Sequence, residues 1–166
     1  MSDYGAYGLI ERAKAGLLDG LNKEIETMSV QDGDSFDFGD PIFAKEGAAG
    51  VAEVGDTTDD TLIFAGVALI SQRSYVEEQG EYVEYTPMNV LSKGRVWVKV
   101  PSGLSSISNT PAYVNDDSTD VDYGKFTNET AYYHTGGFFR SEPIAVGSDY
   151  LAIVEVRGLY RDSDQT

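Results

Sequence analysis

The sequence predicts an all-β protein: a small β-barrel or β-sandwich of short antiparallel strands, with an N-terminal helical or extended arm. Three observations predict this class. The 166 residues include 11 Tyr and 18 Gly, a composition that favours strands and turns. The apolar runs are short and are separated by Gly, Pro and Asp. The stretch 94–100, which holds the only Trp, alternates apolar and polar residues with the period of a strand.

Residues 1–30 differ from the rest and are expected to form the arm, with residues 31–166 forming a single β domain. Apolar residues recur there at helical spacing, but Gly16 and Gly20 each weaken a helix by about 1 kcal/mol relative to Ala. Two interpretations stay open: a helix that caps one end of the barrel, or an arm that orders on a neighbouring subunit. The apolar positions are Ile10, Ala13, Leu17, Leu18, Leu21 and Ile25.

The first strands are expected between residues 36 and 70. Residues 36–44 form one block, and Pro41, which cannot donate a hydrogen bond, marks a strand start or a sheet edge. A short strand is expected at 51–54. The run 62–70 is the longest apolar stretch and predicts a strand buried on both faces, with Gly66 at a bend.

The later strands follow at short intervals. We expect strands at 82–86, at 89–91 leading into 94–100, and at 112–114 and 150–157, while the segments 123–127 and 138–140 flank residues 132–134. In the strand opened by Gly94, Val96, Val98 and Val100 point to one face, and Arg95, Trp97 and Lys99 point to the other.

Charge and composition exclude several classes of partner. Twelve Lys and Arg against 28 Asp and Glu give a net charge of −16, which repels nucleic acid and anionic membrane surfaces. The chain has no Cys, so disulfides and thiolate chemistry are excluded. No apolar run reaches the roughly 18 residues of a membrane span, and residues 1–10 do not resemble a signal peptide.

Two acidic clusters were considered as calcium sites. One contains Asp32, Asp34, Asp37 and Asp40, and the other contains Asp116, Asp117, Asp120 and Asp122. Neither fits the twelve-residue calcium loop, because its final carboxylate is replaced by Phe43, Thr127 or Ala131 in the possible registers. The sequence therefore favours solvated acidic turns, and no metal or cofactor is expected.

Catalytic patterns are weak. His134 is the only His, and a triad with Ser141 lacks a Gly-x-Ser-x-Gly elbow, so His134 is expected in a turn or on the surface. No phosphate-binding loop or dinucleotide fingerprint is present. A hydrolase using acidic residues is the weakest hypothesis.

Aromatic residues at 132–139 open a second functional class, because aromatic rings can stack on sugars. Together with Trp97, they make a carbohydrate-binding surface module of a virion or cell the alternative function. The aromatic residues concerned are Tyr132, Tyr133, Phe138 and Phe139. In strands such residues more often pack in the core or against cross-strand partners.

Several blocks resemble, in the same order, the head decoration (structural cement) proteins of tailed bacteriophages. The strongest is 87–98, PMNVLSKGRVWV, which is similar to the family's Gly-x-x-Trp-Val core strand. The others are 39–43, 64–68, 112–114 and 150–156, so that the resemblance spans about residues 36–157. It departs at 109–111, where Asn-Thr-Pro replaces the usual Gly-Asp, and it covers residues 1–30 poorly.

The resemblance implies a non-enzymatic protein on the outer surface of the capsid, made in the host cytoplasm. Its partners would be the major capsid protein and further copies of itself in a homotrimer, with no nucleic acid and no membrane. The interface residues expected from the sequence are the arm residues Leu9, Ile10, Leu17, Leu18 and Leu21, together with Arg95 and Trp97. Core packing for Trp97 and a solvated strand face for Arg95 remain open as alternatives.

Overall fold

The computed structural model describes residues 13–20, 22–31, 33–45, 47, 50–52, 62–70, 81–84 and 86–160, and it confirms the all-β class. These residues form strands and turns, and none of them is helical. The strands are β1 Glu24–Val30, β2 Ser35–Asp37, β3 Pro41–Lys45, β4 Val51–Ala52, β5 Leu62–Ala68, β6 Glu81–Val83, β7 Pro87–Val100, β8 Pro111–Val114, β9 Phe126–Thr127, β10 Tyr133–Phe139, β11 Ile144–Val146 and β12 Asp149–Arg157.

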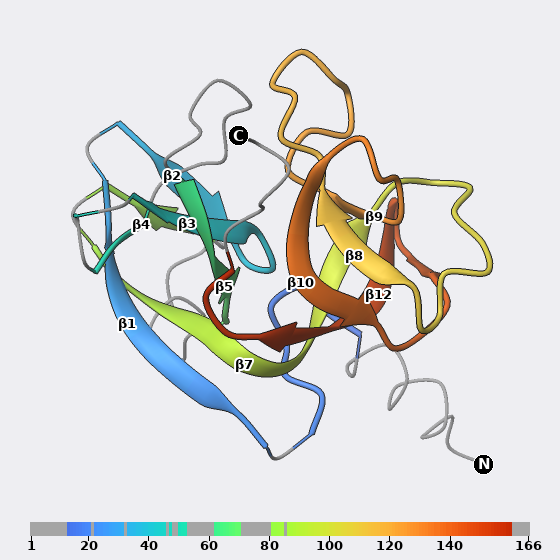
Figure 1. The fold of residues 1–166 in the computed structure, drawn as a ribbon, viewed down its shortest axis with the longest axis horizontal. Helices are drawn as coiled ribbons and strands as arrows, with labels where there is room; N and C mark the ends of the chain where they lie inside the picture. Colours follow the sequence, from blue (N-terminus) through green and yellow to red (C-terminus); the bar gives the residue numbers. More distant parts are fainter. Residues whose placement is uncertain are drawn as a thin grey trace.

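A ten-stranded sheet curls into a nearly closed barrel (Figure 1). Its strand order is β3-β5-β7-β12-β10-β8-β9, with β1 and β11 pairing outside this path and β4 pairing with β1. β2 and β6 form a separate two-stranded sheet. All pairings are antiparallel except that between β1 and β4.

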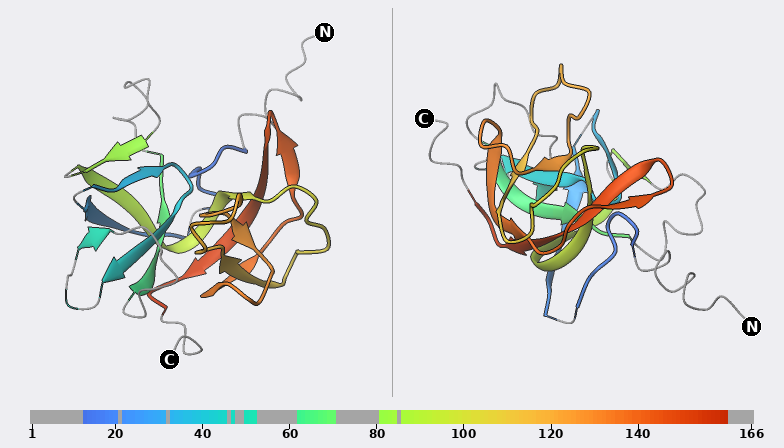
Figure 2. Two further views of the ribbon diagram at one scale, coloured as in Figure 1. Left: turned by 90° about the horizontal axis from the view of Figure 1, so that it is seen from above. Right: turned by 90° about the vertical axis from the view of Figure 1, so that its right-hand side faces the viewer.

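The strand β7 joins two halves of the molecule. Figure 2 shows β1 to β5 on one side and β8 to β12 on the other, with β7 running through both. Before residue 92, β7 pairs with β1 and β5, and from Lys93 onward it pairs with β12. Gly94, expected to open a strand, instead lies inside β7 with φ of 135°, where a Cβ would come within 2.9 Å of the Asn22 carbonyl oxygen.

A bulge in β7 switches the face that each residue presents. Glu24 pairs with Lys93 but Ile25 pairs with Leu91, so Ser92 is the additional residue. Even-numbered residues of β7 therefore face one core before the bulge and another core after it. One long strand thereby contributes to two hydrophobic clusters.

The two clusters are called the large core and the small core. The large core comprises Phe43, Leu62, Phe64, Val67, Leu69, Leu91, Val96, Val98, Val100, Ile107, Ala112, Val114, Phe126, Tyr133, Phe139, Ala152, Val154 and Val156. The small core comprises Met28, Val30, Phe36, Phe38, Ile42, Ala65, Ala68, Tyr82, Met88 and Val90. β5 contributes to both, as the prediction of a strand buried on both faces requires.

Gly66 allows this arrangement. Its φ is 152°, and a side chain at this position would collide with the carbonyl oxygen of Leu91. The register of β3 against β5 also shifts between Ile42 and Phe43. The predicted bend at Gly66 is thus confirmed, as is the strand start at Pro41, which begins the terminal strand of the sheet path.

The described part of the N-terminal region is extended, which is the second of the two forms, helical or extended, that the sequence left open. Residues 13–20, called the strap, run alongside β7. Gly16 N–H donates to Trp97 O over 2.8 Å, Trp97 N–H donates to Leu17 O over 3.0 Å, and Asp19 N–H donates to Arg95 O over 2.8 Å. Residues 24–30 form β1 and pair with β7, so the part that packs with the β domain begins before residue 31. The apolar spacing of the strap would also fit a helix, but its glycines make that helix unstable. Backbone hydrogen bonds to β7 therefore favour the extended form.

Candidate interaction surface

The outer face of the sheet formed by β7, β12 and β10 carries the most distinctive group of side chains. Alternation along β7 places Arg95, Trp97 and Lys99 on this face, opposite the buried valines, as predicted. The register pairs Arg95 with Glu155 and Trp97 with Ile153. β10 adds Phe138, which pairs with Glu155.

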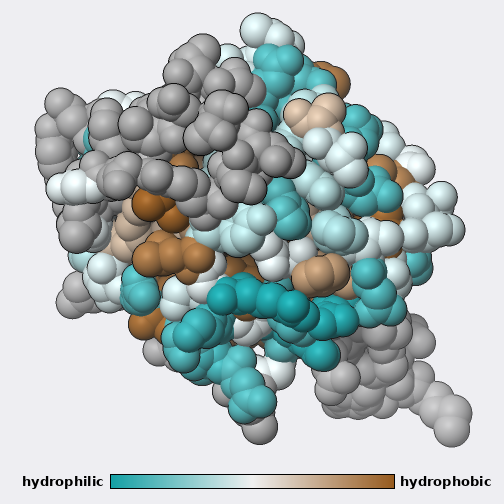
Figure 3. All heavy atoms as spheres, in the orientation of Figure 1, coloured by the Kyte–Doolittle hydropathy of each residue, from teal (hydrophilic) through white to brown (hydrophobic). Residues whose placement is uncertain are grey.

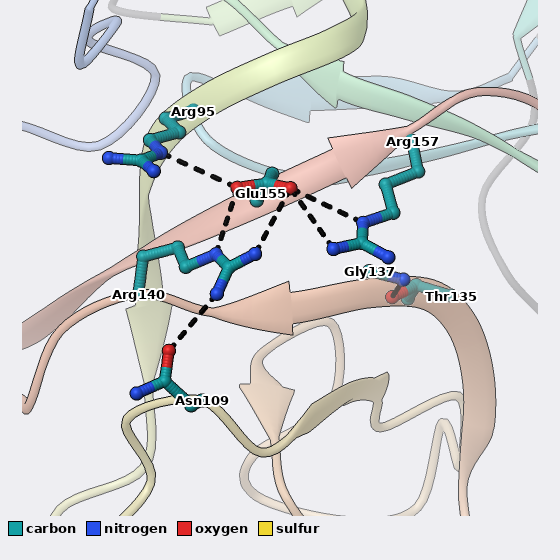
Figure 4. Close-up of polar contacts among 7 residues, drawn as sticks. All are labelled: Arg95, Asn109, Thr135, Gly137, Arg140, Glu155 and Arg157. Atoms are coloured by element: carbon teal, nitrogen blue, oxygen red, sulfur yellow. Dashed lines mark hydrogen bonds and ion pairs between the residues drawn. The ribbon is translucent and has the colours of Figure 1, made fainter.

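Three arginines converge on Glu155 (Figure 4). Arg140 makes a bidentate contact, with Nε 2.8 Å from Oε2 and Nη2 3.2 Å from Oε1. Arg157 Nη2 lies 3.2 Å from Oε1, and Arg95 Nε lies 3.5 Å from Oε2. We call these four residues the arginine cluster. Hydrophilic side chains cover the sheet surface over β7 and β12 in Figure 3.

The pairing shifts the titration of both central groups. Hydrogen bonding from Arg140, followed by its charge and that of Arg157, lowers the pKa of Glu155 against an opposing effect of burial. The same hydrogen bonds, which Glu155 accepts, raise the pKa of Arg140. Both groups are charged at neutral pH, so the cluster carries three positive charges and one negative charge.

Aromatic side chains adjoin the cluster. The guanidinium carbon of Arg157 lies 4.5 Å from the ring centroid of Phe138, a cation–π distance. On the other side, Trp97 packs against Ala13, Ala15 and Leu151. The strap therefore covers part of Trp97, and its exposure is intermediate.

A hollow of about 520 Å³ lies beside the cluster. Its lining includes Asp19 and Gly20 of the strap, Gly94 of β7, and Arg95 and Glu155. A Cβ at Gly20 would meet nothing within 4 Å, so a partner chain could approach the backbone closely there, whereas Asn22 fills the space beside Gly94.

The predicted interface residues fall into three groups. Arg95 belongs to the arginine cluster, and Trp97 lies on the same face. Leu18 packs against the large core and forms a bridge with Val96, while Leu17 is half-buried. Leu9, Ile10 and Leu21 lie outside the described residues. Whether any of them contacts a capsid stays a prediction.

Sequence reasoning missed Arg140, Glu155 and Arg157, and it singled out Phe138 only as a residue that could stack on a sugar. A signal was present, because strict alternation along 150–157 places Glu155 and Arg157 on the face opposite Val154 and Val156. Arg140 had no comparable signal. Its place beside Glu155 depends on the pairing of β10 with β12.

The acidic turn at 116–122 is organised by its own hydrogen bonds. Thr119 donates to Asp117 Oδ1, which lowers the pKa of Asp117. Asp122 N–H donates to Asp120 Oδ1 over 2.8 Å and Tyr132 Oη donates to Asp120 Oδ2 over 3.1 Å, and these two bonds lower the pKa of Asp120. Asp116 is only 3% exposed, contrary to the expected solvated turn. Asp32 of the other cluster lies outside the described residues. Among the residues that are described, no three His, Asp or Glu side chains gather in a way that could hold a metal ion.

Asp40 lies in a second hollow, of about 330 Å³, between the two halves. It accepts a hydrogen bond from Asp37 N–H over 2.8 Å. Burial raises the pKa of Asp40 to about 7, with the neighbouring Asp37 charge adding to the effect. Lys99, whose Nζ lies 3.5 Å from Asp37 Oδ2, also lines this hollow.

Two of the four aromatic residues at 132–139 are not available to stack on a sugar. Tyr133 and Phe139 are buried in the large core, and Tyr133 Oη lies 3.1 Å from the carbonyl oxygens of both Leu62 and Tyr160. His134 is a strand residue of β10, half-buried with Nδ1 3.0 Å from Tyr160 Oη, rather than the expected turn or surface residue. Ser141 Oγ accepts a hydrogen bond from Ile153 N–H over 2.9 Å.

Comparisons with known proteins give a consistent picture. No curated protein matches the chain. Among solved structures, a chain from "The capsid of Myoviridae Phage XM1" shares the fold, with a TM-score of 0.65 and 18% identity over 87% of this chain and 89% of that chain. Among the described residues, no helix is long and apolar enough to cross a membrane.

A family model described as structural cement protein (E217 gp24/Pam3 gp6) matches residues 7–157. This range includes every described strand and the arginine cluster. The chain therefore belongs to the family of phage structural cement proteins, and its role in the capsid is structural.

Proposed function

We propose that this protein binds the outer surface of an assembled phage head and stabilises contacts between major capsid proteins, without catalysing a reaction. The observation that carries the proposal is the family match over residues 7–157. The outer face of β7, β12 and β10 supports it, because Arg and large aromatic residues are enriched at the centres of protein interfaces.

The stabilisation would follow from mass action. A protein that binds the assembled lattice, and not its free subunits, stabilises that lattice by RT ln(1 + [L]/Kd). Many weakly bound copies together would then resist dissociation of the shell. The proposal includes self-association as a homotrimer and synthesis in the host cytoplasm.

Addition of the purified protein to heads that lack it tests the proposal. Co-sedimentation measures binding, and the temperature at which heads release their DNA measures stabilisation. We expect saturable binding and a higher release temperature, with an unrelated protein of similar negative charge as the control. Heads that neither bind the protein nor gain resistance would contradict the proposal.

The arm can be tested in the same assay. Removal of residues 1–12 deletes Leu9 and Ile10 but leaves the strap and β1 in place. If these residues anchor the protein, affinity for heads falls while the urea midpoint of the free protein stays near that of the wild type. An unchanged affinity would exclude them from the interface. Sedimentation equilibrium of the free protein tests the homotrimer.

A further inference from the structure

We infer that the arginine cluster and the adjoining hollow form the docking site for an acidic segment of the capsid partner, with a carboxylate of that segment bound by Arg95 and Arg157. This inference rests on the proposed function and deepens it by giving the partner's chemistry. On this inference, the capsid partner is attracted by the arginine cluster and not by the acidic remainder of this protein's surface.

The charge of the arginine cluster is opposite in sign to that of the whole chain. The chain carries −16, yet the cluster sums to +2, from three arginines and one glutamate. Adding the Lys93–Glu24 pair and Asp19 gives four cations against three carboxylates, still +1. A positive area on a strongly acidic protein is complementary to a partner that presents carboxylates.

The three arginines are used unequally. Arg140 is largely occupied, because it binds Glu155 through two nitrogens and donates from Nη1 to Asn109 Oδ1 over 3.0 Å. Arg157 contacts Glu155 Oε1 through Nε over 3.3 Å and through Nη2 over 3.2 Å, whereas Arg95 reaches Glu155 only through Nε (Figure 4). Both side chains are half-exposed, and no hydrogen bond joins the Nη atoms of Arg95 or Nη1 of Arg157 to another described residue. Arg140 thus positions Glu155, while Arg95 presents two free Nη groups and Arg157 presents one.

The shape of the hollow beside the arginine cluster suits an extended peptide segment. The hollow adjoins Arg95 and lies between the strap and β12. A Cβ at Gly20 would meet nothing within 4 Å, so the strap side of the hollow can accept an extended chain whose backbone approaches closely. Phe138, beneath Arg157, supplies an apolar contact at the edge.

Other occupants fit less well. A nucleic acid would experience repulsion from the whole chain along its length. A second copy of this chain also carries −16, so its approach is opposed by net charge. A short acidic segment is affected less, because the Debye length is about 8 Å at physiological ionic strength and contacting arginines act within that distance.

The binding test uses a double variant, Arg95→Gln with Arg157→Gln, and heads that lack the protein. The control, Lys125→Gln, removes a positive charge from a lysine that pairs with Asp122 outside the cluster. We expect the first variant to bind heads about 10- to 100-fold more weakly and the control to stay within about threefold of the wild type. The affinity of the arginine double variant for heads should also depend less on salt concentration than that of the wild type. Wild-type affinity in the first variant would overturn the inference and leave the proposed function intact, whereas no binding by the wild type would contradict both.

Cross-linking identifies the occupant. The variant Arg95→Lys with Arg157→Lys keeps the charges and supplies amines that a carbodiimide can join directly to carboxylates. On heads, we expect mass spectrometry to find cross-links from position 95 or 157 to Asp or Glu of the major capsid protein. Cross-links only to a second copy of the chain, or only to Glu155, would overturn the inference. Circular dichroism and urea midpoints of all three variants show whether each remains folded.

Discussion

The two faces of the sheet at β7, β12 and β10 differ in what their side chains do. The inner face presents Val96, Val98 and Val154, which are fully buried, and any apolar side chain of matching volume would satisfy the same requirement. The outer face presents three arginines on one glutamate, a combination that packing does not need. The comparison teaches that one face provides stability and that the other is free to provide recognition. Four predictions test this division, from the largest expected effect to the smallest.

Two adjacent phenylalanines on opposite faces give the sharpest test. Phe139 is fully buried in the large core, whereas Phe138 lies on the outer face. Phe139→Ala should lower the free energy of unfolding by about 3–5 kcal/mol, because it leaves a cavity, and Phe138→Ala by less than about 1 kcal/mol. Urea denaturation followed by the fluorescence of Trp97, the only Trp, measures both. Equal losses would break the comparison.

Asp40 extends the comparison to a carboxyl whose burial is not offset by close cations. Its pKa is raised to about 7 from 3.8, so the folded state holds a proton that the unfolded state releases. Its contribution is therefore complete below about pH 4 and is lost as pH rises to 7. At pH 8, Asp40→Asn should be more stable than the wild type by on the order of 2 kcal/mol, and at pH 4 nearly equal to it. Urea midpoints from pH 4 to 8 measure this, and parallel profiles for the two proteins would contradict it.

Glu155 should behave in the opposite sense. Its pKa is lowered in the folded state, so the cluster's contribution is present above the usual value of 4.5 and is lost as pH falls through the folded value. Glu155→Gln leaves three arginines without their shared carboxylate, and we expect a loss of about 1–2 kcal/mol at pH 7. Denaturation at pH 7 and pH 3 checks the sign. A larger loss at the lower pH would show that the carboxylate is not what holds the arginines.

The smallest effect is expected at the exposed Lys93–Glu24 pair, where the side chains are 53% and 61% exposed. Lys93→Gln should change the free energy of unfolding by less than about 0.5 kcal/mol, because water and salt screen such pairs. The same urea assay at low and high salt measures the difference. A loss of unfolding free energy as large as that of Glu155→Gln would contradict this prediction. It would mean that any ion pair on the outer face stabilises the fold as much as three arginines that share one carboxylate.

Local patterns were sufficient for much of the fold. The alternation in 94–100 predicted which side chains of β7 point inward, and the β-branched run 62–70 predicted a strand buried on both faces. The same reasoning left a helix and an extended arm open for residues 1–30, because an apolar spacing of three and four residues fits both. The described part is extended. Backbone hydrogen bonds to Trp97 and Arg95 decide the matter, and spacing does not reveal them.

The candidate site was only partly predictable. Arg95 and Trp97 were found because they share the strand that carries the strongest pattern. Arg140 and Glu155 were missed because they lie 15 residues apart and come together only through the pairing of β10 with β12. Asp116 was expected in solvent, yet only 3% of it is exposed.

The sequence by itself determined the all-β class, the inward valines of β7, the bend at Gly66 and the acidic character of the surface, because each follows from residue type and nearest neighbours. Only the tertiary structure decided that β7 serves two cores through a bulge at Ser92, and that three arginines share Glu155. The physical reason is that strand register and face depend on pairing between distant segments. A shift by one residue would turn each of these side chains to the opposite face.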